Sequence, residues 1–66
     1  MPTRQTRTSD GRIIIQRMNT DLYAMSRDAQ GATWSIYRGH PRKGGEKITG
    51  GCKGTDDVHV VWDAEM

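Results

Sequence analysis

The chain has 66 residues, enough for one small domain, and only 33% of them are apolar. Ordering such a chain costs roughly 100 kcal/mol of conformational entropy, so we expect a marginally stable fold that self-association helps to complete. The formal net charge of +2 conceals an asymmetry, because residues 1–43 carry eight Lys or Arg and three acidic residues, whereas residues 44–66 carry two and five. This imbalance indicates an anionic partner and identifies no reaction.

The composition also argues against several classes of protein. Cys52 is the only cysteine, so no disulfide can form within the chain, and its spacing from His40 and His59 is not that of a zinc site. We therefore expect no metal, no cofactor and no enzymatic activity, since Asp56-Asp57 also reads better as a turn than as a catalytic pair. The longest aliphatic run, residues 13–15, is too short for a membrane span or a signal peptide, which predicts a cytoplasmic protein.

The N-terminal segment, residues 1–11, has no apolar side chain after Met1 and ends in a Ser-Asp-Gly turn signal. Nothing in it favours burial, so the sequence predicts a disordered basic arm. Its cationic side chains are Arg4 and Arg7. Together with Arg12, they are expected to reach along the phosphates of a nucleic acid or into a groove. Residues 12–66 are then expected to form a single small β domain.

Two turn signals predict a three-stranded antiparallel meander over residues 12–38. Residues 28–31 (Asp-Ala-Gln-Gly) suit a four-residue hairpin loop, which sets Met25 opposite Trp34. Residues 19–21 (Asn-Thr-Asp) suit a three-residue turn, which sets Ile15 opposite Met25. Both turns assign the same side chains to the core face: Ile13, Ile15, Tyr23, Met25, Trp34 and Ile36. The alternative is a short helix over residues 21–30, with Thr20 as its N-cap and Gly31 after its end.

The C-terminal part contains a long loop and a last strand. Residues 39–57 hold six of the eight glycines and predict a basic loop, which a short strand through residues 47–49 would divide. The β-branched run Val58–Trp62 predicts a strand with Val58, Val60 and Trp62 on the core face. The predicted fold class is therefore all-β, an antiparallel meander of four or five strands that is curled or dimerised.

One basic segment, Arg38-Gly39-His40-Pro41-Arg42-Lys43, resembles the AT-hook, a short motif of DNA-binding proteins. Five of its six positions match the motif, and His40 stands where the second groove-inserting arginine belongs. The resemblance implies an extended segment in the minor groove of A·T-rich DNA. Because His40 is shorter and mostly neutral at pH 7, we expect phosphate contacts from this segment rather than base recognition.

The predicted register also gives the sheet a second, semi-apolar face. A single antiparallel sheet normally has one dry and one wet side, so this face predicts self-association or a protein partner. It comprises Ile14, Met18, Leu22, Tyr37 and Val61, with Ala24 among them.

The sequence therefore predicts a small non-enzymatic module that binds nucleic acid. Its phosphate contacts are expected from Arg4, Arg7, Arg12, Arg38, Arg42 and Lys43, and Tyr37 is available for stacking on a base. The alternative is a small protein-binding inhibitor or adaptor, of the kind that phages and other mobile elements encode, which occludes a larger protein.

Overall fold

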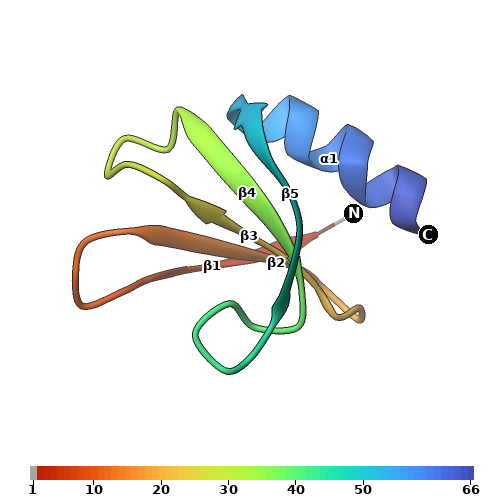
Figure 1. Ribbon diagram of the computed structural model, residues 1–66, viewed down its shortest axis with the longest axis horizontal. Coiled ribbons are helices and arrows are strands. Elements are labelled where there is room, and N and C mark those ends of the chain that lie inside the picture. Colours follow the sequence, from red (N-terminus) through yellow and green to blue (C-terminus); the bar gives the residue numbers. More distant parts are fainter. Residues whose placement is uncertain (1) are drawn as a thin grey trace.

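A five-stranded antiparallel meander and one C-terminal helix make up the computed structural model, which describes residues 2–66 (Figure 1). The order of the strands in the sheet follows the chain: β1 (Thr3–Arg7), β2 (Ile13–Arg17), β3 (Leu22–Ser26), β4 (Thr33–Arg38) and β5 (Glu46–Lys53). Helix α1 (Gly54–Glu65) follows β5 directly and packs against β4 and β5. The prediction of a mainly β antiparallel meander is confirmed, with a helix added.

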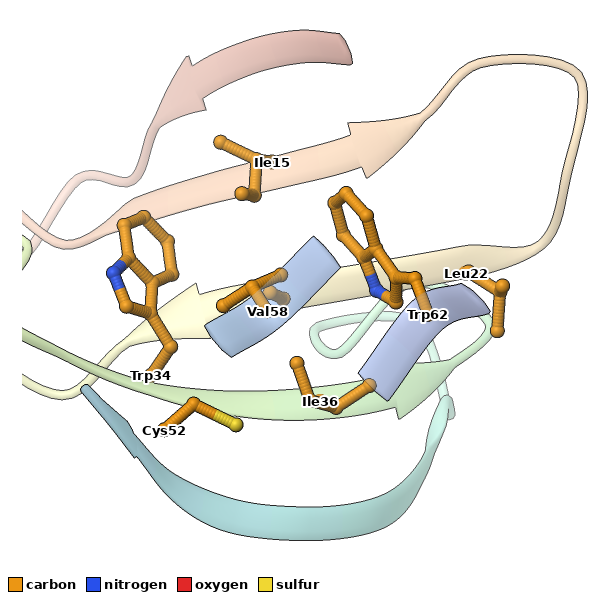
Figure 2. Packing of buried hydrophobic residues seen from close by; sticks show 8 residues of the cluster. Ile15, Leu22, Trp34, Ile36, Cys52, Val58 and Trp62 are labelled. Atoms are coloured by element: carbon orange, nitrogen blue, oxygen red, sulfur yellow. The ribbon is translucent and has the colours of Figure 1, made fainter. Parts of the chain in front are cut away.

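The hydrophobic core lies between α1 and the face of the sheet that the helix covers (Figure 2). Its buried members come from four strands and the helix: Ile15, Leu22, Ala24, Trp34, Ile36, Cys52, Val58 and Trp62. Both indole N–H groups are satisfied by backbone carbonyls, Trp34 Nε1 by Gly31 at 2.8 Å and Trp62 Nε1 by Tyr23 at 3.3 Å. The two tryptophans supply much of the buried apolar surface without leaving a polar group unpaired.

Residues 58–62, predicted as a strand, belong instead to α1. Val58 and Trp62 are four residues apart, so a helix places both on one face, where both are fully buried, and leaves Val60 68% exposed. Asp56 and Asp57 lie in the first turn, where the helix dipole favours negative charge. Within residues 2–66 no helix has the length and apolarity to cross a bilayer.

The register of β3 differs from the predicted one by one residue on each side. The observed pairs place Ala24 opposite both Ile15 and Ile36. A one-residue slip moves every side chain of a strand to the other face of the sheet. Tyr23 and Met25 therefore lie on the face of the sheet that points away from the helix. Leu22 and Ala24, predicted for the second face, are in the core. Because β3 slips against both neighbours, β2 and β4 keep their predicted relation.

Side-chain capping explains why both loops are longer than predicted. Oδ1 of Asp28 accepts the backbone N–H groups of Gln30 and Ala32, at 3.0 and 3.1 Å, and Arg27 then pairs with Thr33. In the β2–β3 turn, Thr20 Oγ1 donates to the carbonyl of Arg17 at 2.6 Å and Asn19 has a φ of 65°. The alternative helix over residues 21–30 is not formed.

The predicted disordered arm is also corrected, because residues 3–7 form the edge strand β1. All five side chains are exposed, so hydrophobic patterning gives no signal for this strand. It is held by its antiparallel pairing with the whole of β2, from Thr3 opposite Arg17 to Arg7 opposite Ile13.

The predicted loop over residues 39–57 shortens to residues 39–45, because β5 extends the proposed strand at residues 47–49 in both directions. The two ends of the remaining loop cross closely. A β-carbon at Gly45 would overlap the carbonyl group of Gly39, and Gly39 itself has a φ of +86°. Glycine at both positions lets the loop turn back tightly over the sheet.

Candidate nucleic-acid interface

The far face of the sheet, opposite α1, carries a row of side chains that crosses all five strands. The row consists of residues that are directly paired from each strand to the next: Arg4, Gln16, Tyr23, Tyr37 and Lys47. We call it the tyrosine row. Its two ends are cationic, its centre is aromatic, and it contains no acidic residue.

The two tyrosines of this row are direct cross-strand partners on β3 and β4. Side chains in such a pair have β-carbons about 4.5–5.5 Å apart, so the two tyrosines project from neighbouring positions on the same face of the sheet. Tyr23 and Tyr37 are each partly exposed. Both stand on inner strands of the sheet, which are hydrogen-bonded on both sides and hold the two backbones in a fixed register.

The loop of residues 39–45 folds over this far face. The His40 ring packs edge-on against Tyr23, with ring centroids 5.3 Å apart, and its Nδ1 accepts the backbone N–H of Arg42 at 3.1 Å. The Arg42 guanidinium donates to Oδ2 of Asp10 in the β1–β2 turn at 2.9 Å. A hydrogen bond from the Thr8 hydroxyl, and next the contact with Arg42, lower the pKa of Asp10 from 3.8 to about 2.

These contacts change the interpretation of the segment that resembles an AT-hook. Residues 41–44 form a turn, and the amides of Lys43 and Gly45 both donate to the carbonyl of His40 at 2.9 Å. The segment is therefore folded against the domain rather than extended. Insertion of this backbone into a narrow groove would require the turn to open first.

Acidic residues of the helix neutralise two cations on its own side of the sheet, Arg17 and Arg38. Arg17, only 8% exposed, donates through Nη1 to Asp63 at 2.7 Å. Arg38, at the end of β4, contacts Glu65 of the helix at 2.8 Å and Asp21 at 3.3 Å. The helix holds four acidic residues and no Lys or Arg. Its negative charge therefore offsets part of the positive charge of the sheet.

The remaining cations make no ion pair within residues 2–66. All six are exposed: Arg4, Arg7, Arg27, Lys43, Lys47 and Lys53. The register places Arg4, Lys47 and Lys53 on the far face, where they are paired with Gln16, Tyr37 and Thr33. Lys43 belongs to the loop over that face. Arg7 lies on the other side, opposite Ile13.

The structure thus separates the phosphate-contacting residues predicted from the sequence. Arg4 and Tyr37 share the far face, whereas Arg38 is paired with acids on the helix side. Arg12 contacts Asp10 at 3.6 Å and the carbonyl of Ser26 at 3.3 Å. Sequence reasoning missed two residues of this face. Tyr23 was placed in the core by the wrong register, and Lys47 was assigned to the long loop, with a short strand at residues 47–49 as an alternative.

The five residues of the predicted self-association face do not share a surface. Leu22 is 1% exposed and belongs to the core, and Ile14 is 3% exposed on the far face. Val61 packs against the core from the helix, Met18 lies in the β2–β3 turn, and only Tyr37 remains on an exposed part of the far face. Self-association itself stays a prediction.

Other candidate groups for chemistry are dispersed. Cys52 is buried, and burial, with a smaller contribution from the charge of Asp57, raises the pKa of its thiol. His59 packs against Trp62 in the helix, with ring centroids 5.2 Å apart. Residues 2–66 contain no pocket and no cluster of three or more potential metal ligands.

Comparisons of the chain with models of protein families, with curated proteins and with solved structures give no match.

Proposed function

We propose that this protein is a non-enzymatic nucleic-acid-binding module whose contact surface is the far face of the sheet. The observation that carries the proposal is the uneven distribution of unpaired cations on the strands, of which Arg4, Lys47 and Lys53 lie on the far face and Arg7 on the helix side. The helix-side cations Arg17 and Arg38 are paired with acids, whereas Arg4, Lys47 and Lys53 on the far face have no acidic partner within residues 2–66.

Such a distribution gives the molecule a basic side and an acidic side despite a net charge of only +2. A polyanion approaching the far face meets Arg4 and Lys47 at the two ends of the tyrosine row and Lys43 in the adjoining loop. Neutralising several phosphates releases their counterions, which favours binding at low salt. The acidic helix repels the same ligand and thereby orients it.

The test is a titration of fluorescent DNA and RNA oligonucleotides with the protein at two salt concentrations, read by anisotropy. The logarithm of the affinity is expected to fall with the logarithm of the salt concentration, by about 0.7–0.9 for each phosphate contact. Absence of binding to every oligonucleotide at the lower salt would overturn the proposal.

Strand β1 supplies a matched pair of variants. Arg4→Ala and Arg7→Ala remove the same charge three residues apart, but from opposite faces of the sheet. We expect Arg4→Ala to weaken binding and to reduce the salt slope by about one contact, and Arg7→Ala to change the affinity much less. Equal losses in the two variants would contradict an oriented far-face contact.

A protein partner is the second candidate function, favoured by the composition of the far face. Tyrosine, methionine and arginine are enriched in the centres of protein interfaces, and Tyr23, Met25 and Tyr37 are all partly exposed there. An inhibitor or adaptor of this kind predicts no binding to nucleic acid at physiological salt and a partner that survives nuclease treatment in a pulldown.

A further inference from the structure

The geometry of the tyrosine row points to single-stranded rather than duplex nucleic acid as its ligand, and we infer that Tyr37 and Tyr23 each stack on one unpaired base. This inference rests on the proposed function and narrows it to one class of ligand. It follows from the arrangement of the row, the position of the helix and the packing of His40.

Cationic and aromatic side chains follow a fixed order along the row. Arg4 and Lys47 lie at opposite ends, four strand spacings apart, which is roughly 19 Å at about 4.8 Å per strand. The paired tyrosines lie between them. Cations at the ends suit phosphates, and exposed aromatic faces in the middle suit bases, which is the combination that single-strand-binding surfaces use.

Within residues 2–66, no helix is placed on the far face to enter a groove of a duplex. Bases in a duplex are stacked on one another, so their faces are closed to a tyrosine ring, and their edges are reached by an element that enters a groove. The one helix in the described part of the chain is acidic, carries no Lys or Arg and covers the other side of the sheet. The far face therefore offers stacking surfaces and no groove-inserting helix.

The two tyrosine rings differ in the side chains that they contact. The ring of His40 packs edge-on against Tyr23. His40 is held in place by the backbone N–H of Arg42, and the side chain of Arg42 is in turn paired with Asp10. Tyr37 has no aromatic neighbour within the described residues and is flanked by Lys47. Tyr37 is therefore the more accessible platform, and a base on Tyr23 has to lie beside His40.

The experiment compares three labelled probes of equal length and mixed sequence: single-stranded DNA, single-stranded RNA and duplex DNA. Anisotropy titrations at low salt measure the wild type and the variants Tyr37→Ala, Tyr37→Phe and Tyr23→Ala, each checked for its fold by circular dichroism. Stacking by one aromatic side chain contributes about 5- to 150-fold in affinity, from 1–3 kcal/mol per base.

We expect both single strands to bind more tightly than the duplex. Tyr37→Ala should lose about 5- to 150-fold for single strands and little for the duplex, Tyr23→Ala should lose less, and Tyr37→Phe should retain the affinity because its ring still stacks. Unequal affinities for the DNA and RNA strands would show whether the 2′-hydroxyl contributes.

Two outcomes would overturn the inference, and they are distinguishable. Equal affinity for single strands and duplex, unaffected by Tyr37→Ala, would leave nucleic-acid binding in place and remove the stacking role. Absence of binding to all three probes would overturn the proposed function as well.

Discussion

The two faces of the sheet are built from the same strands and differ in how their polar groups are compensated. On the helix side, Arg17 is buried and its charge is matched by Asp63. On the far face, the next paired position across β1 and β2 holds Arg4 and Gln16, and the Arg4 charge has no acidic partner in residues 2–66. Arg17 is therefore compensated within the fold, whereas Arg4 remains available to a ligand.

The comparison shows that a modest net charge is a poor guide to a binding surface. Helix α1, which covers only one side of the sheet, holds four of the eight acidic residues. Their effect on Arg17 and Arg38 is direct, at 2.7 and 2.8 Å, whereas their effect on exposed groups farther away is screened by solvent and salt. The far face can therefore be basic in a protein whose total charge is nearly balanced.

The largest difference between the two faces is expected in stability. Trp62→Ala removes a fully buried side chain from the helix and should cost about 3–5 kcal/mol, comparable to the whole stability of a small domain. Tyr37→Ala removes a partly exposed ring and should cost about 1 kcal/mol. Urea unfolding followed by circular dichroism measures both, and equal losses would mean that the far face is also core.

The ion pair between the buried Arg17 and the exposed Asp63 gives the next largest effect. Asp63→Asn leaves the charge of Arg17, whose Nε already has no hydrogen-bond partner, without its anion, and should cost about 1–3 kcal/mol. Adding Arg17→Met removes the stranded charge, so the double variant should be more stable than the sum of the single losses predicts. Additive losses in the urea-unfolding cycle would show that the pair contributes nothing specific.

The contact between the β1–β2 turn and the loop over the far face should show in the titration of Asp10. Its pKa of about 2 lies below the ordinary 3.8, so the stabilisation it reports is present above pH 3.8 and is lost as the pH falls toward 2. Carbon-detected NMR of the carboxyl group should show Thr8→Val raising this pKa toward 3.8, and Arg42→Ala raising it less. An unchanged pKa in both variants would contradict the contact.

The smallest effect tests whether a ligand stays on the far face. Asp56 is an exposed acid of the helix without an ion pair in the described residues. Asp56→Asn should change the affinity for an oligonucleotide by less than about two-fold at physiological salt, because distant exposed charges are screened. A large gain would place the ligand on the helix side instead.

Some features followed from local sequence alone. The two turn signals predicted the antiparallel order of strands β2 to β4 and placed Ile15, Trp34 and Ile36 in the core. The charge asymmetry also followed from the sequence, because it requires only a count of acidic and basic residues in each part of the chain. These features depend on neighbours in the chain, which is why pattern reasoning reached them.

Longer-range features depended on the tertiary structure. The residues of β1 are all exposed and carry no hydrophobic pattern, so only backbone pairing with β2 defines the strand. One additional residue in each loop that flanks β3 decided which side chains of β3 face the core. The same residues decided that Tyr23 is paired with Tyr37. Trp34 is buried on the predicted face, but its burial did not determine the length of either loop that flanks β3.

The C-terminal element shows most directly what sequence and tertiary structure each contributed. By itself the sequence determined that Val58 and Trp62 are apolar, four residues apart and surrounded by acids. A separation of four residues puts two side chains on the same side of either a strand or a helix, so the pattern could not choose between them. The tertiary structure decided for the helix, because it buries both side chains on the sheet and turns Asp63 and Glu65 toward the arginines of one face.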